Sequence, residues 1–455
     1  MAENAAAAVQ VTEAEKKATL NKVVFSSFLG NFIEWFDYAS YSYLATVIAL
    51  VFFPDTDHAV AVMLTFVVFA ISYLVRPLGA FFWGSFGDKH GRKEALAISI
   101  LLMSGSTFLI GCLPSYALVG LLSPILLLLL RMTQAFSAAG EYAGASTFIA
   151  EYAPTDHRGF YCSMVPASTA VGLLIGSFFA TGMYAIWGAD SWFVVTWGWR
   201  IPFWLAGPLG YITHYIRSRL EDSPVYEKML ADMEEEGEGQ KDLHPIKTLF
   251  TKYPKVTIIA FGTAIMNAIG FYAVLTFMPN YLETVLGYDP ASASVFTNIV
   301  LVVYIAFIFI SGRLSDKVGR KKMLTAAASG FVILTVPCYL MMGTMQFGVI
   351  LAAELIMAFL LTLNDGTLAS YLSETFPTEV RFTGFATTFN FANGIFGGSI
   401  SAISLALVNM TGSQLAPAFY FIFMAAVALV CILLSKEYTG VSLDEIHKMH
   451  QGKIN

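Results

Sequence analysis

Charge is scarce in this sequence. Asp, Glu, Lys and Arg make up 13% of the 455 residues, which is about half of their share in an ordinary soluble domain. Hydrophobic residues make up 56% instead, and a water-soluble globule cannot bury that much apolar surface. A lipid bilayer removes the difficulty because it solvates an apolar exterior. The composition therefore predicts a membrane protein.

Signals for disulfides, nucleic acid, metals and nucleophilic catalysis are also missing. The four cysteines lie in apolar runs, where we expect small buried hydrophobic residues. There is no basic stripe with aromatics between the charges, and neither His-Glu-x-x-His nor Gly-x-Ser-x-Gly occurs. His447 and His450 have helical spacing, but they lie in a polar tail and are expected to be solvated. We expect no enzyme, no metal site and no cofactor.

Long apolar runs predict twelve membrane-spanning helices, since one span needs about 20 apolar residues. A charged linker at 219–255 separates six helices in 23–218 from six in 256–436, and polar tails at 1–22 and 437–455 flank them. The first tail lacks the pattern of a cleaved signal peptide. The predicted spans are 23–51, 59–84, 94–113, 118–150, 158–187, 198–218, 256–282, 291–313, 323–344, 346–373, 381–408 and 416–435.

Lysine and arginine occur almost only in alternate loops between these spans. Lys89 and Arg92 follow the second span and Arg320 follows the eighth, whereas the intervening loops hold none. Only Arg200 lies near the opposite face, where it could pair with Asp190 or line an entrance. Basic loops stay in the cytoplasm, so we predict a multi-pass protein of the bacterial inner membrane, a plasma membrane, with both termini cytoplasmic.

Two motifs occur twice. Residues 84–93, GSFGDKHGRK, match residues 312–321, GRLSDKVGRK, at an offset of 228. Residues 151–158, EYAPTDHR, match residues 374–381, ETFPTEVR, at an offset of 223. Such a repeat predicts two six-helix bundles inserted with the same topology and related by a pseudo-two-fold axis along the membrane normal.

The duplicated Gly-x-x-x-Asp-x-x-Gly-Arg-Lys loop resembles the signature of the major facilitator superfamily. Within it, the chain is similar to the metabolite:proton symporter family over residues 22–436, with Ala135 where that family usually has glycine. The segments that carry this second resemblance are NFIEWFDY at 31–38, RPLG at 76–79, RMTQAFSAAGEY at 131–142, GWRIPF at 198–203 and EDSP at 221–224.

The resemblance implies a transporter but leaves its cargo open. The family includes proline/betaine, α-ketoglutarate, citrate and shikimate transporters. Residues 140–146, GEYAGAS, look most like the proline/betaine members, whereas residues 393–398, NGIFGG, look more like the organic-acid members. Osmosensing members can carry a long C-terminal coiled coil, and the short tail after residue 436 has no heptads.

Ionisable side chains within an apolar span are costly and therefore mark functional hypotheses. Glu34 and Asp37 lie in the first span and Arg131 in the fourth, and the resemblance implies that these two helices line the central cavity. A carboxylate beside an arginine stays ionised until the cavity changes, and can then accept a proton. Glu34, Asp37 and Arg131 are therefore candidates for proton coupling, and a static ion pair is the alternative.

Polar and aromatic side chains on the inner faces of several spans could bind substrate, although helix packing explains such residues equally well. Trp35, Tyr38, Tyr41, Phe271 and Tyr272 could surround a quaternary ammonium. Arg76 is expected to extend to the cytoplasmic interface, with substrate binding as the alternative. The substrate-binding candidates are Asn31, Tyr38, Tyr41, Gln134, Glu141, Tyr142, Asn267, Tyr272, Asn364, Asp365, Asn390 and Asn393.

The repeated loops supply a set of candidate gating residues. Arg92 is expected to reach Glu151, and Arg320 to reach Glu374, so that the pairs hold one access state closed. Retention of positive charge in the cytoplasm is the alternative. The gating candidates are Asp88, Arg92, Glu151, Arg158, Asp316, Arg320, Glu374 and Arg381.

The favoured hypothesis is proton-coupled uptake of a small polar metabolite by alternating access, in a monomer, with the proton as coupling ion. A zwitterionic osmolyte such as proline or betaine is the first choice of cargo. An organic acid such as α-ketoglutarate or citrate is the alternative. A transport-like nutrient receptor is a more remote possibility, because such a receptor would carry a much longer cytoplasmic tail.

Overall fold

The computed structural model describes residues 13–237 and 243–453, and every regular element in these ranges is helical. The first half contains α1 (Glu13–Tyr43), α2 (Ala45–Phe52), α3 (His58–Tyr73), α4 (Arg76–His90), α5 (Arg92–Cys112), α6 (Tyr116–Val119), α7 (Leu122–Ala138), α8 (Glu141–Tyr152), α9 (Arg158–Cys162), α10 (Met164–Trp187), α11 (Trp192–Thr196) and α12 (Ile201–Ser218). The second half contains α15 (Pro254–Tyr272), η4 (Ala273–Phe277), α16 (Met278–Asn280), η5 (Tyr281–Val285), α17 (Pro290–Val318), α18 (Arg320–Met342), α19 (Phe347–Thr375), α20 (Arg381–Ala392), η7 (Asn393–Gly397), α21 (Ile400–Thr411) and α22 (Ala416–Leu434).

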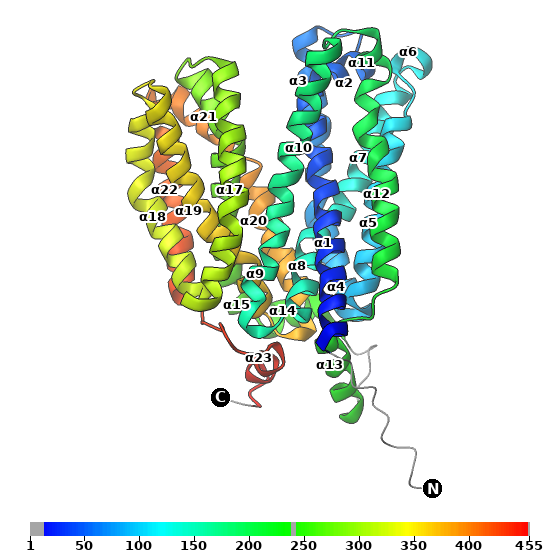
Figure 1. Cartoon of the computed structure of the whole chain (residues 1–455), viewed down its shortest axis with the longest axis vertical. Helices are drawn as coiled ribbons and strands as arrows, with labels where there is room; N and C mark the ends of the chain where they lie inside the picture. Colours follow the sequence, from blue (N-terminus) through cyan, green and yellow to red (C-terminus); the bar gives the residue numbers. More distant parts are fainter. Residues whose placement is uncertain (1–12, 238–242, 454–455) are drawn as a thin grey trace.

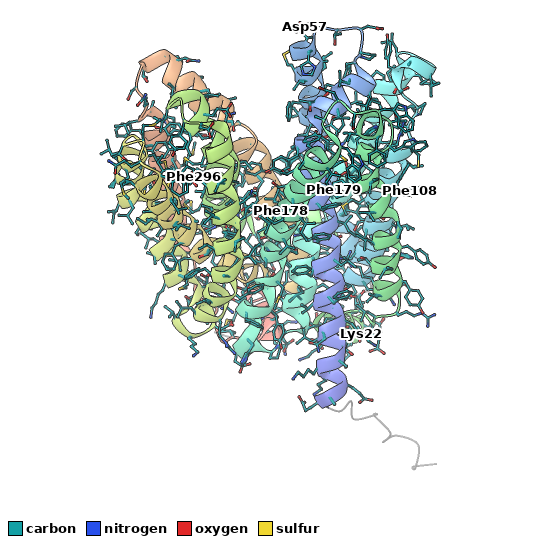
Figure 2. All side chains as sticks on the ribbon, turned by 45° about the horizontal axis from the view of Figure 1, so that its top comes forward. Lys22, Asp57, Phe108, Phe178, Phe179 and Phe296 are labelled. Carbon is teal, nitrogen blue, oxygen red and sulfur yellow. The ribbon has the colours of Figure 1, made fainter. Side chains whose placement is uncertain are left out.

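Ten helical segments of the described ranges are long and apolar enough to cross a membrane. The first helix and α12 complete two bundles of six, as the sequence predicts. Large apolar side chains cover the outside of the bundles: Phe108 is 38% exposed and Phe178 is 53% exposed. Figure 2 shows such side chains around both bundles. This surface suits lipid rather than water.

Several predicted spans are broken rather than continuous. The fourth span, predicted as one helix, is split into α7 and α8 around Gly140, where an added Cβ would lie 2.6 Å from the Cβ of Trp83. The seventh and eleventh spans contain π-helical turns, η4, η5 and η7. Such turns interrupt the regular backbone hydrogen bonds, and they often occur at functional sites.

Glycines allow close helix packing within each bundle. A Cβ on Gly172 of α10 would lie 2.8 Å from the backbone nitrogen of Phe36 on α1. In the second bundle, a Cβ on Gly366 of α19 would lie 2.8 Å from the carbonyl oxygen of Ile308 on α17. Small residues at these contacts bring backbones together, which is how membrane helices gain packing energy without a hydrophobic driving force between them.

The two bundles meet at one end of the molecule and diverge toward the other (Figure 1). The first and last described residues lie at the closed end, where the repeated Lys- and Arg-rich loops also lie, and we call it the basic end. Figure 2 labels Lys22 near this end and Asp57 at the opposite end. The structure is therefore closed at the basic end.

Short helices cover the basic end. The linker contains α13 (Pro224–Glu235) and α14 (Pro245–Lys252), and the tail contains α23 (Leu443–His450). A capping box between Ser442 and Glu445 starts α23. His447 of this helix is only 8% exposed, so the expectation that the tail histidines are solvated is wrong. Leu443, one helical turn before His447, is also buried, because this face of α23 packs against the bundles.

Candidate functional site

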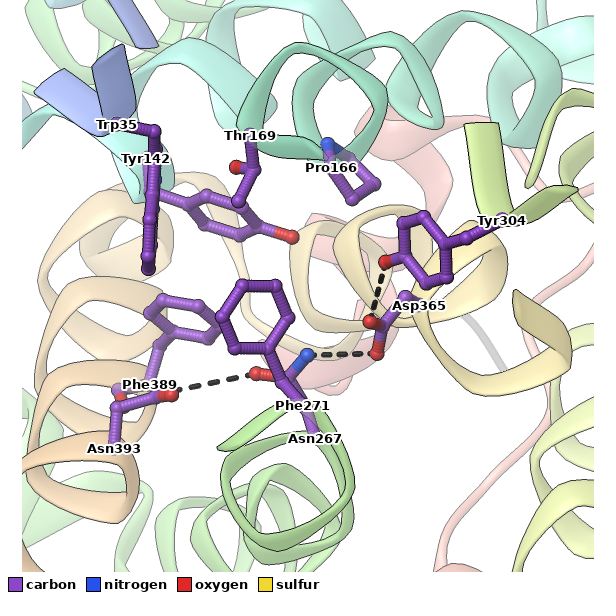
Figure 3. A pocket seen from close by; sticks show the side chains of 10 residues that line it. All are labelled: Trp35, Tyr142, Pro166, Thr169, Asn267, Phe271, Tyr304, Asp365, Phe389 and Asn393. Carbon is purple, nitrogen blue, oxygen red and sulfur yellow. Dashed lines mark hydrogen bonds between the residues drawn. The ribbon is translucent and has the colours of Figure 1, made fainter. Parts of the chain in front are cut away.

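A small cavity lies between the two bundles and is lined by side chains from both (Figure 3). The first bundle contributes side chains from α1, α8 and α10, and the second from α15, α17, α19, α20 and η7. The lining residues are Trp35, Tyr142, Pro166, Thr169, Asn267, Phe271, Tyr304, Asp365, Phe389 and Asn393. A ligand in this cavity would touch both halves at once.

Aromatic rings form much of the cavity wall. Tyr142 of the first bundle stacks on Phe389 of the second, with ring centroids 4.3 Å apart and an interplanar angle of 3°. Trp35 meets Phe271 edge-on, with centroids 5.2 Å apart. Ring faces carry partial negative charge and attract cations. The wall is therefore suited to an ammonium or quaternary ammonium group.

Asp365 supplies the negative charge of this cavity. Its carboxylate accepts hydrogen bonds from the Tyr304 hydroxyl at 2.6 Å, from Asn267 Nδ2 at 2.7 Å and from Asn364 Nδ2 at 2.9 Å. Asn393 in turn donates to Asn267 Oδ1 at 3.4 Å. No lysine or arginine in the described ranges pairs with Asp365. An ionised carboxylate buried without a counter-charge is costly, so this position favours a bound cation or a proton.

Asp37 and Arg131 form a second buried charge cluster, inside the first bundle. Arg131 Nη1 lies 2.6 Å from Asp37 Oδ2, and Gln134 Nε2 donates to the same oxygen at 2.6 Å. The Arg131 guanidinium also lies 3.8 Å from the ring centroid of Tyr41. The sequence left open whether Glu34 or Asp37 approaches Arg131, and the structure places Asp37 there.

Glu34 pairs with Arg76 instead, at 2.9 Å. Arg76 is 6% exposed, and it also donates to the Tyr38 hydroxyl at 3.1 Å and to Asn390 Oδ1 of the second bundle at 3.3 Å. The expectation that Arg76 extends to the interface is therefore wrong, because its pairing with Glu34 holds it inside. This cluster links the two halves beside the cavity.

Four of the substrate-binding candidates line the cavity: Tyr142, Asn267, Asp365 and Asn393. The others lie outside its wall, and several are engaged elsewhere. Glu141 pairs with Arg217 at 2.5 Å, and Asn31 donates to Ser168 and Thr169 of α10 at 2.8 Å each. The remaining residues outside the wall are Tyr38, Tyr41, Gln134, Tyr272, Asn364 and Asn390.

Arg200 does not pair with Asp190, although it lines an open cavity at the end opposite the basic end. Its guanidinium donates to the carbonyl oxygens of Gly111 and Leu113 at 2.7 Å each. These bonds tie the start of α12 to the end of α5, which is a structural role within the first bundle.

Sequence reasoning missed Pro166, Thr169, Tyr304 and Phe389. Tyr304 is a single tyrosine in the apolar run of α17, 61 residues from Asp365. Its spacing carries no local signal, since only the packing of α17 against α19 brings the two together. The carboxylate of Asp365, in the middle of an apolar helix, is the sequence feature that could have prompted a search for its donors.

The repeated motifs meet at the basic end as a network of buried ion pairs. Arg92 lies 3.2 Å from Glu151, and Arg320 lies 3.1 Å from Glu374, so the structure brings both predicted pairs together within their own halves. Two further pairs cross between the halves. These are Arg381 with Glu151 at 2.7 Å and Arg158 with Glu374 at 2.9 Å.

The two motif aspartates cross between the halves as well. Asp88 accepts the backbone N–H groups of Phe382 and Thr383 at 3.1 and 2.8 Å, at the start of α20. Asp316 accepts those of Gly159 and Phe160 at 2.7 and 3.0 Å, at the start of α9. A carboxylate at a helix N-terminus satisfies free N–H groups and complements the helix dipole. Each half thus caps a helix of the other.

Two pseudo-symmetric helical bundles, a central cavity between them and a closure at one end define a secondary transporter of the major facilitator type. The chain belongs to the family described as "Sugar (and other) transporter", which it matches over residues 22–450. The resemblance to the major facilitator superfamily and its metabolite:proton symporters is thereby confirmed. It is a multi-pass membrane protein.

The chain is also similar to individual transporters and to a solved transporter structure. The chain is 35% identical to the proline/betaine transporter of Salmonella typhimurium over 94% of this chain and 84% of that one. It is 34% identical to the glycine betaine/proline/ectoine/pipecolic acid transporter OusA of Dickeya dadantii, over 92% and 83%. The proton:xylose symporter XylE bound to 6-bromo-6-deoxy-D-glucose shares the fold, with a TM-score of 0.76, 19% identity and coverage of 95% and 99%.

Proposed function

We propose that this protein is a proton-coupled symporter of a small zwitterionic osmolyte of the proline or betaine type, working by alternating access. The observation that carries the proposal is the cavity between the halves, where aromatic rings surround a carboxylate that has no cationic partner. An ammonium group is attracted by both. The names of the relatives, which are proline and betaine transporters, support the same class of cargo.

The basic end is proposed to face the cytoplasm, as the distribution of lysine and arginine predicts. The closed basic end then makes the structure outward-facing, and transport requires the ion pairs between the halves to open. The protein is proposed to work as a monomer, since each chain contains both halves of the central cavity.

Proton coupling is proposed to involve the buried carboxylates of the first bundle. Asp37 is held by Arg131 and Gln134, and Glu34 by Arg76, which itself reaches Asn390 of the second bundle. Movement of the second bundle would break the Arg76–Asn390 contact and change the charge environment of Glu34. Such a change could alter the proton affinity of Glu34 between the two access states.

Uptake by the full chain in proteoliposomes tests the cargo. Labelled glycine betaine should accumulate under an inward-directed proton gradient, and unlabelled proline should compete with it. α-Ketoglutarate and citrate should not compete. Accumulation of labelled α-ketoglutarate with no uptake of betaine or proline would move the protein to the organic-acid alternative.

The variant Asp365→Asn tests the cavity. It keeps the shape of the side chain but removes its charge, and we expect betaine binding to weaken at least tenfold. Glu354→Gln is the matched control, because Glu354 is a buried carboxylate of the same helix that lies outside the cavity wall. Equal affinity in the wild type and the Asp365→Asn variant would contradict the proposed role of Asp365.

A further inference from the structure

A second cavity lies at the basic end of the second bundle, away from the central one. It is open to the surface and lies between the start of α15, the end of α19, the end of α22 and the C-terminal tail. The lining residues are Lys255, Val256, Ile259, Tyr371, Thr375, Leu434, Ser435, Lys436, Tyr438 and His450. The sequence and the proposed transport cycle assign it no role.

The charged side chains of this cavity are basic. Lys255 and Lys436 are exposed, and neither forms an ion pair within the described ranges. Burial lowers the pKa of His450, and the positive charge of Lys436 lowers it further. The negative charge of Glu379 acts on the pKa of His450 in the opposite direction, and Glu379 already accepts a hydrogen bond from the Tyr253 hydroxyl at 2.6 Å. Two lysines are therefore available to an anion.

A buried hydroxyl points to the same kind of ligand. Tyr371 is 2% exposed, and its hydroxyl oxygen has no hydrogen-bond partner of normal geometry. The hydroxyls of Ser435, Thr263 and Thr375 surround it. Those of Ser435 and Thr375 donate to backbone carbonyls of their own helices, of Ile432 at 2.7 Å and of Tyr371 at 2.7 Å. Their oxygens can still accept, but none forms a bond of normal geometry with the Tyr371 hydroxyl, so this buried donor remains open to a better acceptor.

The remaining wall of the cavity is apolar and borders the lipid-facing surface. Val256 and Ile259 lie on one turn of α15, and Leu434 at the end of α22 is 65% exposed. A soluble anion gains nothing from this wall. A molecule with a phosphate group at one end and hydrocarbon at the other would use both parts.

We propose that this cavity binds the phosphate headgroup of an anionic phospholipid from the membrane leaflet that borders the basic end. The ammonium groups of Lys255 and Lys436 hold the phosphate, and the Tyr371 hydroxyl donates to one of its oxygens. The acyl chains run along Leu434 and Ile259. Because Tyr438 and His450 belong to the tail, a bound lipid also strengthens the docking of α23.

Thermal unfolding of the full chain in mixed micelles tests the site. Phosphatidylglycerol is titrated against phosphatidylcholine, whose headgroup also carries a phosphate but has no net charge. We expect saturable stabilisation by phosphatidylglycerol alone. The Lys255→Gln/Lys436→Gln variant should lose most of that shift. The Lys317→Gln/Lys322→Gln variant should keep it, because those exposed lysines lie at the same end outside the cavity.

The variant Tyr371→Phe is a second probe that leaves both lysines in place. We expect it to raise the phosphatidylglycerol concentration for half of the stabilisation about fivefold, as the loss of one hydrogen bond to a charged group would. Each variant is compared with itself in phosphatidylcholine, so a general loss of stability does not obscure the result. Native mass spectrometry should show the bound lipid on the wild type and on the Lys317→Gln/Lys322→Gln variant.

Three outcomes would overturn the proposal. Equal loss of stabilisation in the two double-lysine variants would reduce the effect to general charge attraction. Equal stabilisation by phosphatidylcholine would remove the role of anionic charge. Full stabilisation by inorganic phosphate, compared with chloride at the same ionic strength, would identify the ligand as free phosphate rather than lipid.

Discussion

At the scale of single residues, buried carboxylates differ in how their charge is balanced. Asp37 and Glu34 each have an arginine partner, whereas Asp365 has only neutral hydrogen-bond donors. A charge already paired with arginine has little to gain from a substrate cation. An unpaired one has much to gain, so substrate recognition and proton coupling can reside in different bundles of the molecule.

Tyr304 is expected to support substrate binding through Asp365. Tyr304→Phe removes the 2.6 Å hydrogen bond to the carboxylate while keeping the ring in the cavity wall. We expect the dissociation constant for betaine to rise about fivefold, which corresponds to a loss of about 1 kcal/mol of binding free energy. Equilibrium binding in detergent measures it. An unchanged constant would show that the hydrogen bond does not contribute to recognition.

Glu34 is expected to be needed for coupling but not for membrane insertion. Glu34→Gln keeps a hydrogen-bond acceptor for Arg76 and removes the titrating group. Uptake driven by a proton gradient should be abolished in proteoliposomes, while the amount of folded protein stays the same. Continued accumulation of substrate by this variant would exclude Glu34 as the coupling site, and Asp37→Asn in the same assay would then test the other candidate.

At the scale of elements, the contacts that join the two halves are concentrated at the ends of helices. The starts of α9 and α20 each receive an aspartate from the opposite half, and Glu151 and Glu374 each accept arginines from both halves. All of these groups are buried. Removing one partner therefore leaves an uncompensated charge, which is far costlier than losing an exposed ion pair.

Loss of Glu151 is expected to weaken the closed basic end. Glu151→Gln leaves Arg92 and Arg381 buried without their shared carboxylate, which costs about 3 kcal/mol or more in the closed state. Spin labels on the exposed positions His90 and Lys317, in a variant without native cysteines, measure the separation of the halves. We expect a longer-distance population in the Glu151→Gln variant. Unchanged distances would contradict a role of this residue in closure.

Docking of α23 is expected to depend on pH through His447. Burial, and then the charge of Arg381, lower the pKa of this histidine from 6.5 to about 4. The docked helix thus binds a proton more weakly than the free helix. Docking is fully favourable above about pH 6.5 and weakens as the pH falls toward 4, by up to about 3 kcal/mol.

Limited proteolysis of the tail measures this dependence. Cleavage between residues 437 and 450 should be slow at pH 7.5 and faster at pH 5. In a His447→Gln variant, which cannot take up the proton, the difference between the two pH values should largely disappear. A tail equally protected at both pH values in the wild type would contradict the prediction.

At the scale of the whole molecule, much of the architecture could be predicted from the sequence. Apolar runs, the alternation of lysine and arginine, and the two repeated motifs predict the spans, the bundles and the pairing of Arg92 with Glu151. These features can be predicted because they depend on local composition or on the fixed spacing of a motif. The pairing of Arg158 with Glu374, between halves, follows from neither, because it depends on how the bundles dock.

The central site is less predictable, because it too depends on how the bundles dock. Asp365 and Asn267 stand out as polar residues in apolar helices, but nothing local assigns Tyr304 or Phe389 to them. The misplacement of Arg76 has a physical cause as well. A long basic side chain could reach the interface, and only the position of Glu34 on a neighbouring helix decides that it stays inside.

The tail helix connects parts of the molecule that must separate during transport. Arg158 of the first bundle donates to the Val441 carbonyl, Arg381 of the second donates to that of Leu443, and Lys228 of the linker pairs with Asp444 at 2.8 Å. Opening the basic end must break some of these bonds. The tail therefore has to release either Arg158 or Arg381 each time the basic end opens, and it stays with the bundle whose arginine keeps its bond.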